Sequence, residues 1–270
     1  MGRKRLIGLT ITLLAVSITA LVLQWVRNQL GDESTFTGWT LLTATMGLYL
    51  LTARKRMIAR RLGPVAAWLQ VHMYMGTFAS IVFLMHIGWP VRGLFESFLA
   101  ACFVVVAVSG IALGLLSRST PRKLAAIEGD YLLERIPALR ANVAGDAHNT
   151  AISSAGFGEG ATLAEFYQRR LLPFFQSPRG LLYQLIPNGF ARRQLLRELN
   201  DLDRYLAEQG NASRLRLIHL VKSKDDLDYH QALQTRLRLF FAAHVALTWA
   251  LALMIGVHVV LVYRFQGVML

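Results

Sequence analysis

Four histidines lie inside long apolar stretches of this sequence, with the same spacing in both stretches. His72 and His86 share one stretch, His244 and His258 share another, and thirteen residues separate the members of each pair. An α-helix rises ~1.5 Å per residue, so fourteen steps cover ~21 Å and ~3.9 turns. Both imidazoles of a pair therefore project from nearly the same helix face. That span fits within the ~30 Å hydrocarbon core of a bilayer, where histidines are rare and usually functional.

The elements that must position these histidines are membrane-spanning helices. The chain has 270 residues, of which 54% are hydrophobic and clustered, a composition too apolar for an ordinary soluble domain. We expect an all-α fold, an integral membrane helical bundle of about five transmembrane helices. No small-residue cleavage site follows the first apolar run, so we expect that run to be retained as a helix. The five predicted spans are residues 6–26, 38–53, 65–88, 96–117 and 238–264.

Positive charge predicts how these helices are oriented. The net charge is +13, and most Lys and Arg residues outside the spans flank alternate ends of the predicted helices. The positive-inside rule places the N-terminus in the cytoplasm and the C-terminus outside, which we interpret as a bacterial cytoplasmic membrane. The residues on the cytoplasmic side are Arg3, Lys4, Arg5, Arg54, Lys55, Arg56, Arg60, Arg61, Arg118, Arg122 and Lys123, against Arg27, Arg92 and Arg264 outside.

The predicted organisation is a membrane part with a cytoplasmic insertion. Residues 1–117 hold helices one to four, residues 118–237 form a helical insertion, and residues 238–270 hold helix five. Within the insertion we expect a loop at 145–161 and a helix at 190–209 that ends at Gly210. A further helix from about Leu215 could continue directly into the fifth span, unless the charged run at 222–226 interrupts it.

Parallel helices decide which histidines form a pair. The third and fifth spans run in the same direction, so equal offsets lie at equal depths. We therefore expect His72 with His244 around an inner haem iron, and His86 with His258 around an outer one. Neutral imidazoles cost less in a bilayer than charges do, and iron satisfies the ring nitrogen that it binds. The predicted cofactors are two b-type haems.

Other cofactors fit the sequence less well. Zinc prefers three or four ligands together, whereas each predicted site offers two histidines and no nearby acid. The single cysteine, Cys102, excludes a cysteine-ligated iron–sulfur cluster within this chain. Haem propionates would need cations, and small residues would let a macrocycle approach a helix. The candidates for these roles are Arg60, Arg61, Arg236 and Arg238 near the inner haem, Arg92 and Arg264 near the outer one, and Gly76, Gly110 and Gly114.

Two helices that each carry His-x13-His within a bundle of four resemble the membrane cytochromes b, as in the b subunit of cytochrome bc complexes. The resemblance covers about 150 residues and depends on His72, His86, His244 and His258. Ferric-reductase and NADPH-oxidase membrane domains are a second resemblance, since they also place paired histidines on their third and fifth helices. This chain departs from both groups in its long insertion, and it lacks an appended flavin or nicotinamide domain.

The function that we expect is electron transfer across the membrane. A dihaem subunit could connect a quinone pool to a partner such as a multihaem cytochrome or an iron–sulfur or flavin protein. Two alternatives remain open: a self-contained transmembrane reductase, and a haem-free membrane anchor or receptor. A third haem that uses His230 with His148 or His219 is also conceivable, although a solvated His230 is the more ordinary interpretation.

Overall fold

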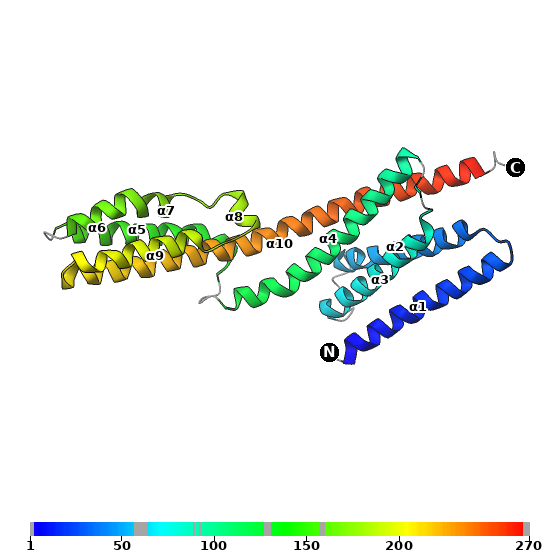
Figure 1. Cartoon of the computed structure of the whole chain (residues 1–270), viewed down its shortest axis with the longest axis horizontal. Helices are drawn as coiled ribbons and strands as arrows, with labels where there is room; N and C mark the ends of the chain where they lie inside the picture. The colour runs from blue at the N-terminus through cyan, green and yellow to red at the C-terminus, as the bar shows by residue number, and fades with distance from the viewer. Residues whose placement is uncertain are drawn as a thin grey trace. The chain divides into compact units, whose positions relative to one another are not determined.

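The computed structural model describes residues 3–56, 64–88, 90–91, 93–126, 131–156 and 160–266, and these are helical almost throughout. No strand occurs among the described residues, which confirms the all-α class. The chain forms two compact units (Figure 1). The first unit comprises Met1–Gly114 and Ala243–Leu270, and the second comprises Leu115–Ala242.

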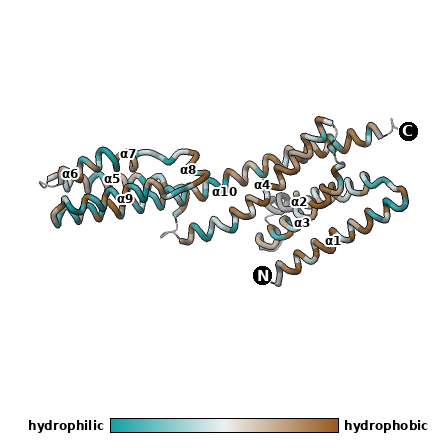
Figure 2. The backbone as a smooth tube through the Cα atoms, viewed as in Figure 1, coloured by the Kyte–Doolittle hydropathy of each residue, from teal (hydrophilic) through white to brown (hydrophobic). Residues whose placement is uncertain are grey.

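The first unit is built from long helices that are mostly apolar (Figure 2). By length and composition, four helices of the described chain could cross a membrane: α1, α3, α4 and α10. The helix at the second predicted span, α2, is not among them, because threonines interrupt its apolar run. The bounds are α1 Arg3–Asn28, α2 Glu33–Arg56, α3 Val65–His86, α4 Leu94–Leu124 and α10 Glu208–Gln266.

Local sequence explains where these helices begin. Asp32 precedes α2, and its Oδ1 accepts hydrogen bonds from the backbone N–H groups of Ser34 at 2.9 Å and Thr35 at 3.2 Å. Those two N–H groups have no partner within the helix, so the carboxylate acts as an N-cap. Gly93 precedes α4 with a φ of +95°, which a residue with a Cβ rarely adopts.

Helices α1, α2 and α3 pack closely, with α3 in contact with the other two (Figure 1). Glycines allow this approach. A Cβ added at Gly8 of α1 would lie 2.3 Å from the ring of Tyr74 on α3. A Cβ at Gly47 of α2 would lie 2.6 Å from Sδ of Met75, also on α3. Small residues at such contacts are the usual means by which membrane helices come together.

Helix α10 runs without a break from Glu208 to Gln266. The charged residues at 222–226 do not interrupt it, because several of them are paired within the second unit. The expectation of one continuous helix from the insertion into the fifth span is therefore confirmed for the backbone. Gly210, predicted to end a helix, lies instead in the first turn of α10.

In the second unit, several shorter helices and the N-terminal part of α10 pack around an apolar core. The core contains Leu163, Leu171 and Phe175 from one side and Leu199 and Leu217 from the other, all almost fully buried. Residues 167–171 form one turn of π-helix. The bounds are η1 Leu133–Arg135, α5 Ile136–Ala155, α6 Gly160–Phe166, η2 Tyr167–Leu171, α7 Leu172–Gln176, α8 Leu181–Leu185, α9 Phe190–Asp201 and η3 Leu202–Tyr205.

Two local predictions for this unit are wrong. Most of the loop predicted at 145–161 is helical, since α5 extends to Ala155 and residues 157–159 lie outside the described chain. Its alanines favour helix, and Thr150 and Ser154 turn their hydroxyls back onto backbone carbonyls of the same helix. The helix predicted at 190–209 ends earlier, at Asp201, and a 3₁₀ turn follows it.

A network of charged side chains lies inside the second unit. Lys224 and Asp228 are fully buried, and Lys224 Nζ donates to Asp228 Oδ2 at 2.6 Å. Arg179 and Arg140 also pair with Asp228, at 3.2 and 2.8 Å. Burial lowers the pKa of Lys224 and raises the pKa of Asp225, which pairs with Arg179. Buried charges persist only when they are paired, so this network depends on Asp228.

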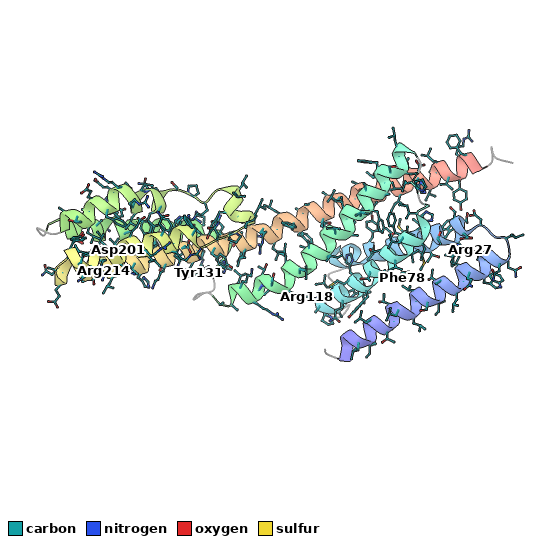
Figure 3. The ribbon with its side chains drawn as sticks, viewed as in Figure 1. Arg27, Phe78, Arg118, Tyr131, Asp201 and Arg214 are labelled. Carbon is teal, nitrogen blue, oxygen red and sulfur yellow. The ribbon has the colours of Figure 1, made fainter. Side chains whose placement is uncertain are left out.

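A buried arginine, Arg214, lies at the junction of α9 and α10. Arg214 of α10 pairs with Asp203 and donates to Asn200 Oδ1 at 3.2 Å. Figure 3 labels Arg214 together with Asp201, the last residue of α9. These contacts connect the first turns of α10 to the end of α9 and to the 3₁₀ turn that follows it.

Asp228→Asn should destabilise the second unit by about 3–5 kcal/mol, because it leaves buried cations without their shared carboxylate. Pulse proteolysis of the full chain in detergent, across a urea series, should show cleavage within 115–242 at lower urea. The control is Glu165→Gln, which removes an exposed pair with Arg169 and should change little. Equal resistance of the two variants would contradict the role given to Asp228.

Candidate functional site: two histidine pairs in the first unit

His72 on α3 and His244 on α10 lie close together inside the first unit, with their rings nearly perpendicular. Their ring centroids are 6.5 Å apart and their planes are inclined by 82°. The rings are half-buried, and neither belongs to a group of three or more His, Cys, Asp or Glu side chains among the described residues. The structure therefore brings together the pair predicted for the inner site.

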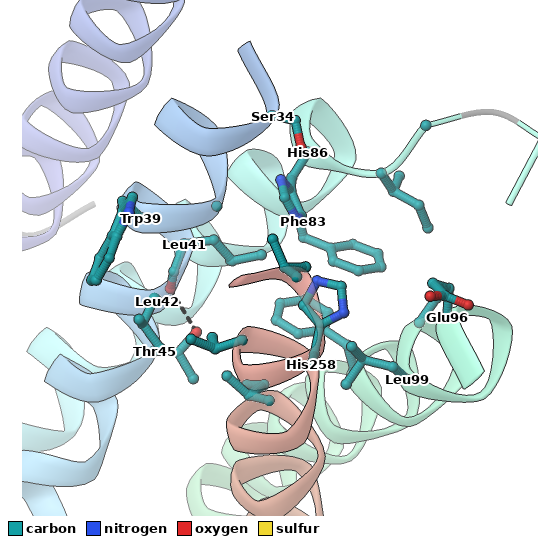
Figure 4. A pocket seen from close by; sticks show the side chains of 18 of the residues that line it. Ser34, Trp39, Leu41, Leu42, Thr45, Phe83, His86, Glu96, Leu99 and His258 are labelled. Carbon is teal, nitrogen blue, oxygen red and sulfur yellow. Dashed lines mark hydrogen bonds between the residues drawn. The ribbon is translucent and has the colours of Figure 1, made fainter. Parts of the chain in front are cut away.

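His86 and His258 line a common cavity of about 560 Å³ (Figure 4). A volume in the range of ~300–1,000 Å³ is typical of sites for small molecules and cofactors. The lining is predominantly apolar, with Phe83 and Leu99 among its residues and Glu96 at one side. The cavity is formed by α2, α3, α4 and α10, so the pair predicted for the outer site also comes together.

The His86 ring is oriented by a threonine on α2. Thr37 Oγ1 donates to the Glu33 carbonyl at 2.8 Å and lies 3.0 Å from Nδ1 of His86. A hydroxyl has one hydrogen, so when the carbonyl receives it, the hydroxyl oxygen accepts from the imidazole. In that arrangement His86 carries its proton on Nδ1, and Nε2 keeps a free lone pair. Next to Thr37, a Cβ at Gly38 would lie 3.1 Å from Cε1 of His86.

The His244 ring is oriented in the same way by a serine on α4. Ser109 Oγ donates to the Val106 carbonyl at 2.8 Å and lies 2.8 Å from Nδ1 of His244. By the same argument, His244 carries its proton on Nδ1 and leaves Nε2 free. A Cβ at Gly110 would lie 3.2 Å from Cε1 of His244. Each histidine pair thus has one member fixed by a hydroxyl residue followed by a glycine.

Neither Thr37 nor Ser109 was predicted from the sequence, and nor was Gly38. Gly110 was predicted as a residue beside a macrocycle, and in the structure it lies against the His244 ring. The dipeptides Thr37-Gly38 and Ser109-Gly110 are the signal that could have found them. A hydroxyl residue followed by a glycine predicts little by itself. It becomes informative only when the fold shows that its helix lies next to a helix that carries one of the four histidines.

His72 differs from His86 and His244 in how its ring is held. The backbone of Leu48 lies near the His72 ring, but Nδ1 of His72 is buried and makes no hydrogen bond of normal geometry. The His258 ring lies against Phe95, with centroids 6.4 Å apart and planes inclined by 20°. In each pair, one ring is therefore held by a hydrogen bond between its Nδ1 and a hydroxyl, whereas these contacts do not hold the other ring in that way.

The remaining predicted glycines occupy different surroundings. A Cβ at Gly114 would meet Met73 Sδ at 3.8 Å, an ordinary contact between α4 and α3. A Cβ at Gly76, one turn after His72, would meet nothing within 4 Å. Gly76 thus leaves open space on the face of α3 that carries His72.

The predicted propionate-binding arginines that the structure describes are Arg236, Arg238 and Arg264. Arg236 and Arg238 belong to the second unit, where they contact the Leu185 carbonyl at 3.5 Å and Glu134 at 3.7 Å. Arg264 is exposed near the end of α10. Arg60, Arg61 and Arg92 lie outside the described residues.

The other three histidines all belong to the second unit. His230 is only 2% exposed, so its interpretation as a solvated histidine is wrong. It packs against Tyr131, with centroids 5.6 Å apart, and its Nδ1 lies 3.2 Å from Gln234 Nε2. His148 lies against Tyr167, and His219 is exposed. These contacts place His230 in a packed setting between Tyr131 and Gln234.

A scan against protein-family models and searches of curated proteins and of solved structures found no match to this chain. The argument for function therefore starts from the geometry of the four histidines.

Proposed function

We propose that this chain is a membrane-embedded dihaem cytochrome b subunit. It would carry electrons across the bilayer between a quinone or quinol pool and a partner redox protein. The observation that supports this most strongly is the distance between His72 and His244. Two metal–imidazole bonds of ~2 Å, each with ~1.1 Å from the nitrogen to the ring centre, place ring centroids ~6.2 Å apart. The distance in the structure is 6.5 Å.

The angle between the rings is compatible with the same proposal. Two imidazoles on opposite faces of one iron can each rotate about the axis that joins their nitrogens. Planes inclined by 82° therefore do not conflict with a shared metal. Bis-histidine ligation would fill both axial positions, which favours electron transfer over oxygen chemistry.

The polar atoms around the rings also fit haem. Nδ1 of His86 and Nδ1 of His244 lie against the hydroxyls of Thr37 and Ser109, and with the ring protons there, Nε2 would be available to a metal. Metal-bound histidines almost always donate their other N–H in this manner. The cavity between His86 and His258 offers space with apolar walls, and the open side of Gly76 offers space at the inner pair.

The chain would hold each haem in position and exclude water from it. The haem iron supplies reversible one-electron transfer when bound. The two histidine rings on each helix lie ~21 Å apart along its axis. The two haem sites would therefore lie at different depths in the hydrocarbon core of a bilayer. We place the N-terminus and the second unit in the cytoplasm of a bacterial membrane, because the basic residues cluster on that side. The partner would bring the substrate chemistry.

Purified full-length protein should contain two haems per chain. The measurement is a pyridine haemochrome assay with a dithionite-reduced minus oxidised spectrum. His86→Ala and His258→Ala should each lower the haem content to about one per chain, because an axial ligand is lost. His219→Ala, an exposed histidine of the second unit, is the matched control and should retain two.

A spectrum without a b-type α-band would end the proposal. Three haems per chain, falling to two in His230→Ala, would show a third site that the proposal does not include. If two haems are present, oxidation of a quinol analogue by the intact complex would separate a quinone-linked subunit from a self-contained reductase.

Thr37→Val should raise the reduction potential of the outer haem and leave the inner one unchanged. The hydrogen bond from His86 Nδ1 makes the ligand more basic and stabilises the oxidised iron. A hydrogen bond worth ~1 kcal/mol corresponds to ~40 mV for one electron. Ser109→Ala should raise only the inner potential, by a similar amount.

The matched control for this titration is Thr45→Val. Thr45 lines the same cavity as His86, but its hydroxyl bonds to the Leu41 carbonyl of its own helix. Its loss should leave both potentials within a few millivolts. Equal shifts in Thr37→Val and Thr45→Val would show that the change reflects cavity polarity and not the ligand's hydrogen bond.

A further inference from the structure

The short helix α8 and the turn after it expose a patch of large apolar side chains on the second unit. Leu182 is 74% exposed and Ile186 is 67% exposed, and their neighbours are similarly open. We name this patch the α8 surface; it consists of Leu181, Leu182, Leu185, Ile186 and Phe190. Isolated apolar residues are common on protein surfaces, but five within ten positions mark an interaction site.

The rest of α8 faces inward, so the exposure is confined to one side. The Tyr183 ring packs under the Arg179 guanidinium at 4.9 Å, and the Tyr183 hydroxyl is buried. Gln184 lines a small internal cavity with Arg140 and Asp228. Because these contacts anchor α8 to the charged network, its leucines cannot turn inward without breaking them.

The position of α8 along α10 indicates what covers this surface. Arg236 donates to the Leu185 carbonyl at 3.5 Å, and Arg236 precedes the predicted start of the fifth span by two residues. Nearby, Arg238 pairs with Glu134 at 3.7 Å. The α8 surface is therefore attached to α10 where the helix approaches the membrane. Its apolar residues lie beside the start of the apolar run and not at the far end of the unit.

The charge beside the α8 surface also indicates a membrane interface as its partner. A Cβ at Gly189 would lie 3.2 Å from an Nη atom of Arg193, so this exposed arginine lies next to the turn that carries Phe190. Apolar side chains rimmed by arginine are typical of segments that lie in the interfacial region of an anionic membrane.

We propose that the α8 surface inserts into the cytoplasmic interfacial layer of the bilayer that α10 spans. Leu181, Leu182, Leu185, Ile186 and Phe190 contact the acyl chains below the headgroups, and Arg193 contacts headgroup phosphate. The proposal depends only on the membrane-spanning part of the proposed function and does not require haem. It assigns the insertion a second attachment to the membrane, besides its connections to α4 and α10.

The test is the depth of spin labels in the full chain, reconstituted one copy per nanodisc in a bilayer that contains anionic lipid. In a Cys102→Ala background, a label at Leu182→Cys is compared with one at Leu215→Cys. Leu215 is also an exposed leucine of the second unit, but it lies 21 residues before Arg236 on α10. Collision with oxygen reports lipid, and collision with a water-soluble nickel chelate reports water.

The ratio of oxygen to nickel collision should be at least ~3-fold higher at 182 than at 215, as expected for residues below the headgroups. Equal ratios at the two positions would overturn the proposal. A label at 182 that is shielded only when several copies share one bilayer would identify a second copy as the occupant and would also overturn it.

A third label distinguishes failure of this inference from failure of the proposed function. Leu253 lies within the predicted fifth span and is exposed in the isolated chain. A label at Leu253→Cys should report lipid if α10 crosses the membrane. Lipid at 253 with water at 182 would refute only the α8 proposal, whereas water at both would refute the membrane topology itself.

Discussion

The constraint on which the first unit depends is that an imidazole inside an apolar environment has two nitrogens to satisfy. One polar atom without a partner in such a place is costly, and water is not there to provide one. In His86 and His244, a hydroxyl oxygen on a neighbouring helix satisfies Nδ1. The hydroxyl can do so because it gives its own hydrogen to a carbonyl of its helix. What remains is Nε2, and under the function that we propose a haem iron would be its partner.

This constraint also explains the choice of residues on the helices that carry no ligand. Thr37 and Ser109 have side chains short enough to remain bonded to their own backbone while they face a ring. Gly38 and Gly110 remove the Cβ atoms that would press on Cε1 of the same rings. Helix α2 is accordingly rich in threonine and less apolar than its neighbours, although it lines the cavity of the outer pair.

The sequence was sufficient for the class of fold and for the histidine partners, because both follow from periodicity. The pairing of His72 with His244 and of His86 with His258 follows from their equal spacing, the helix rise and the predicted number of membrane crossings. It was insufficient for Thr37 and Ser109, whose role depends on which helix faces which ring. The charged run at 222–226, which includes Lys224, predicts a possible break, because a sequence does not show whether Lys224 has a buried partner such as Asp228. Tertiary pairing buries both and keeps α10 continuous. For the same reason, the sequence does not show that His230 packs against Tyr131.

The central claim is that each histidine pair shares one haem iron, and electron paramagnetic resonance of the oxidised protein tests it most directly. Two low-spin ferric signals should appear. The ring planes of His72 and His244 are nearly perpendicular, so the inner signal should be strongly anisotropic with a large maximum g-value. His244→Ala should abolish that signal and leave the other. High-spin iron in the unmodified protein, or no ferric signal in preparations that contain the intact chain, would contradict the account.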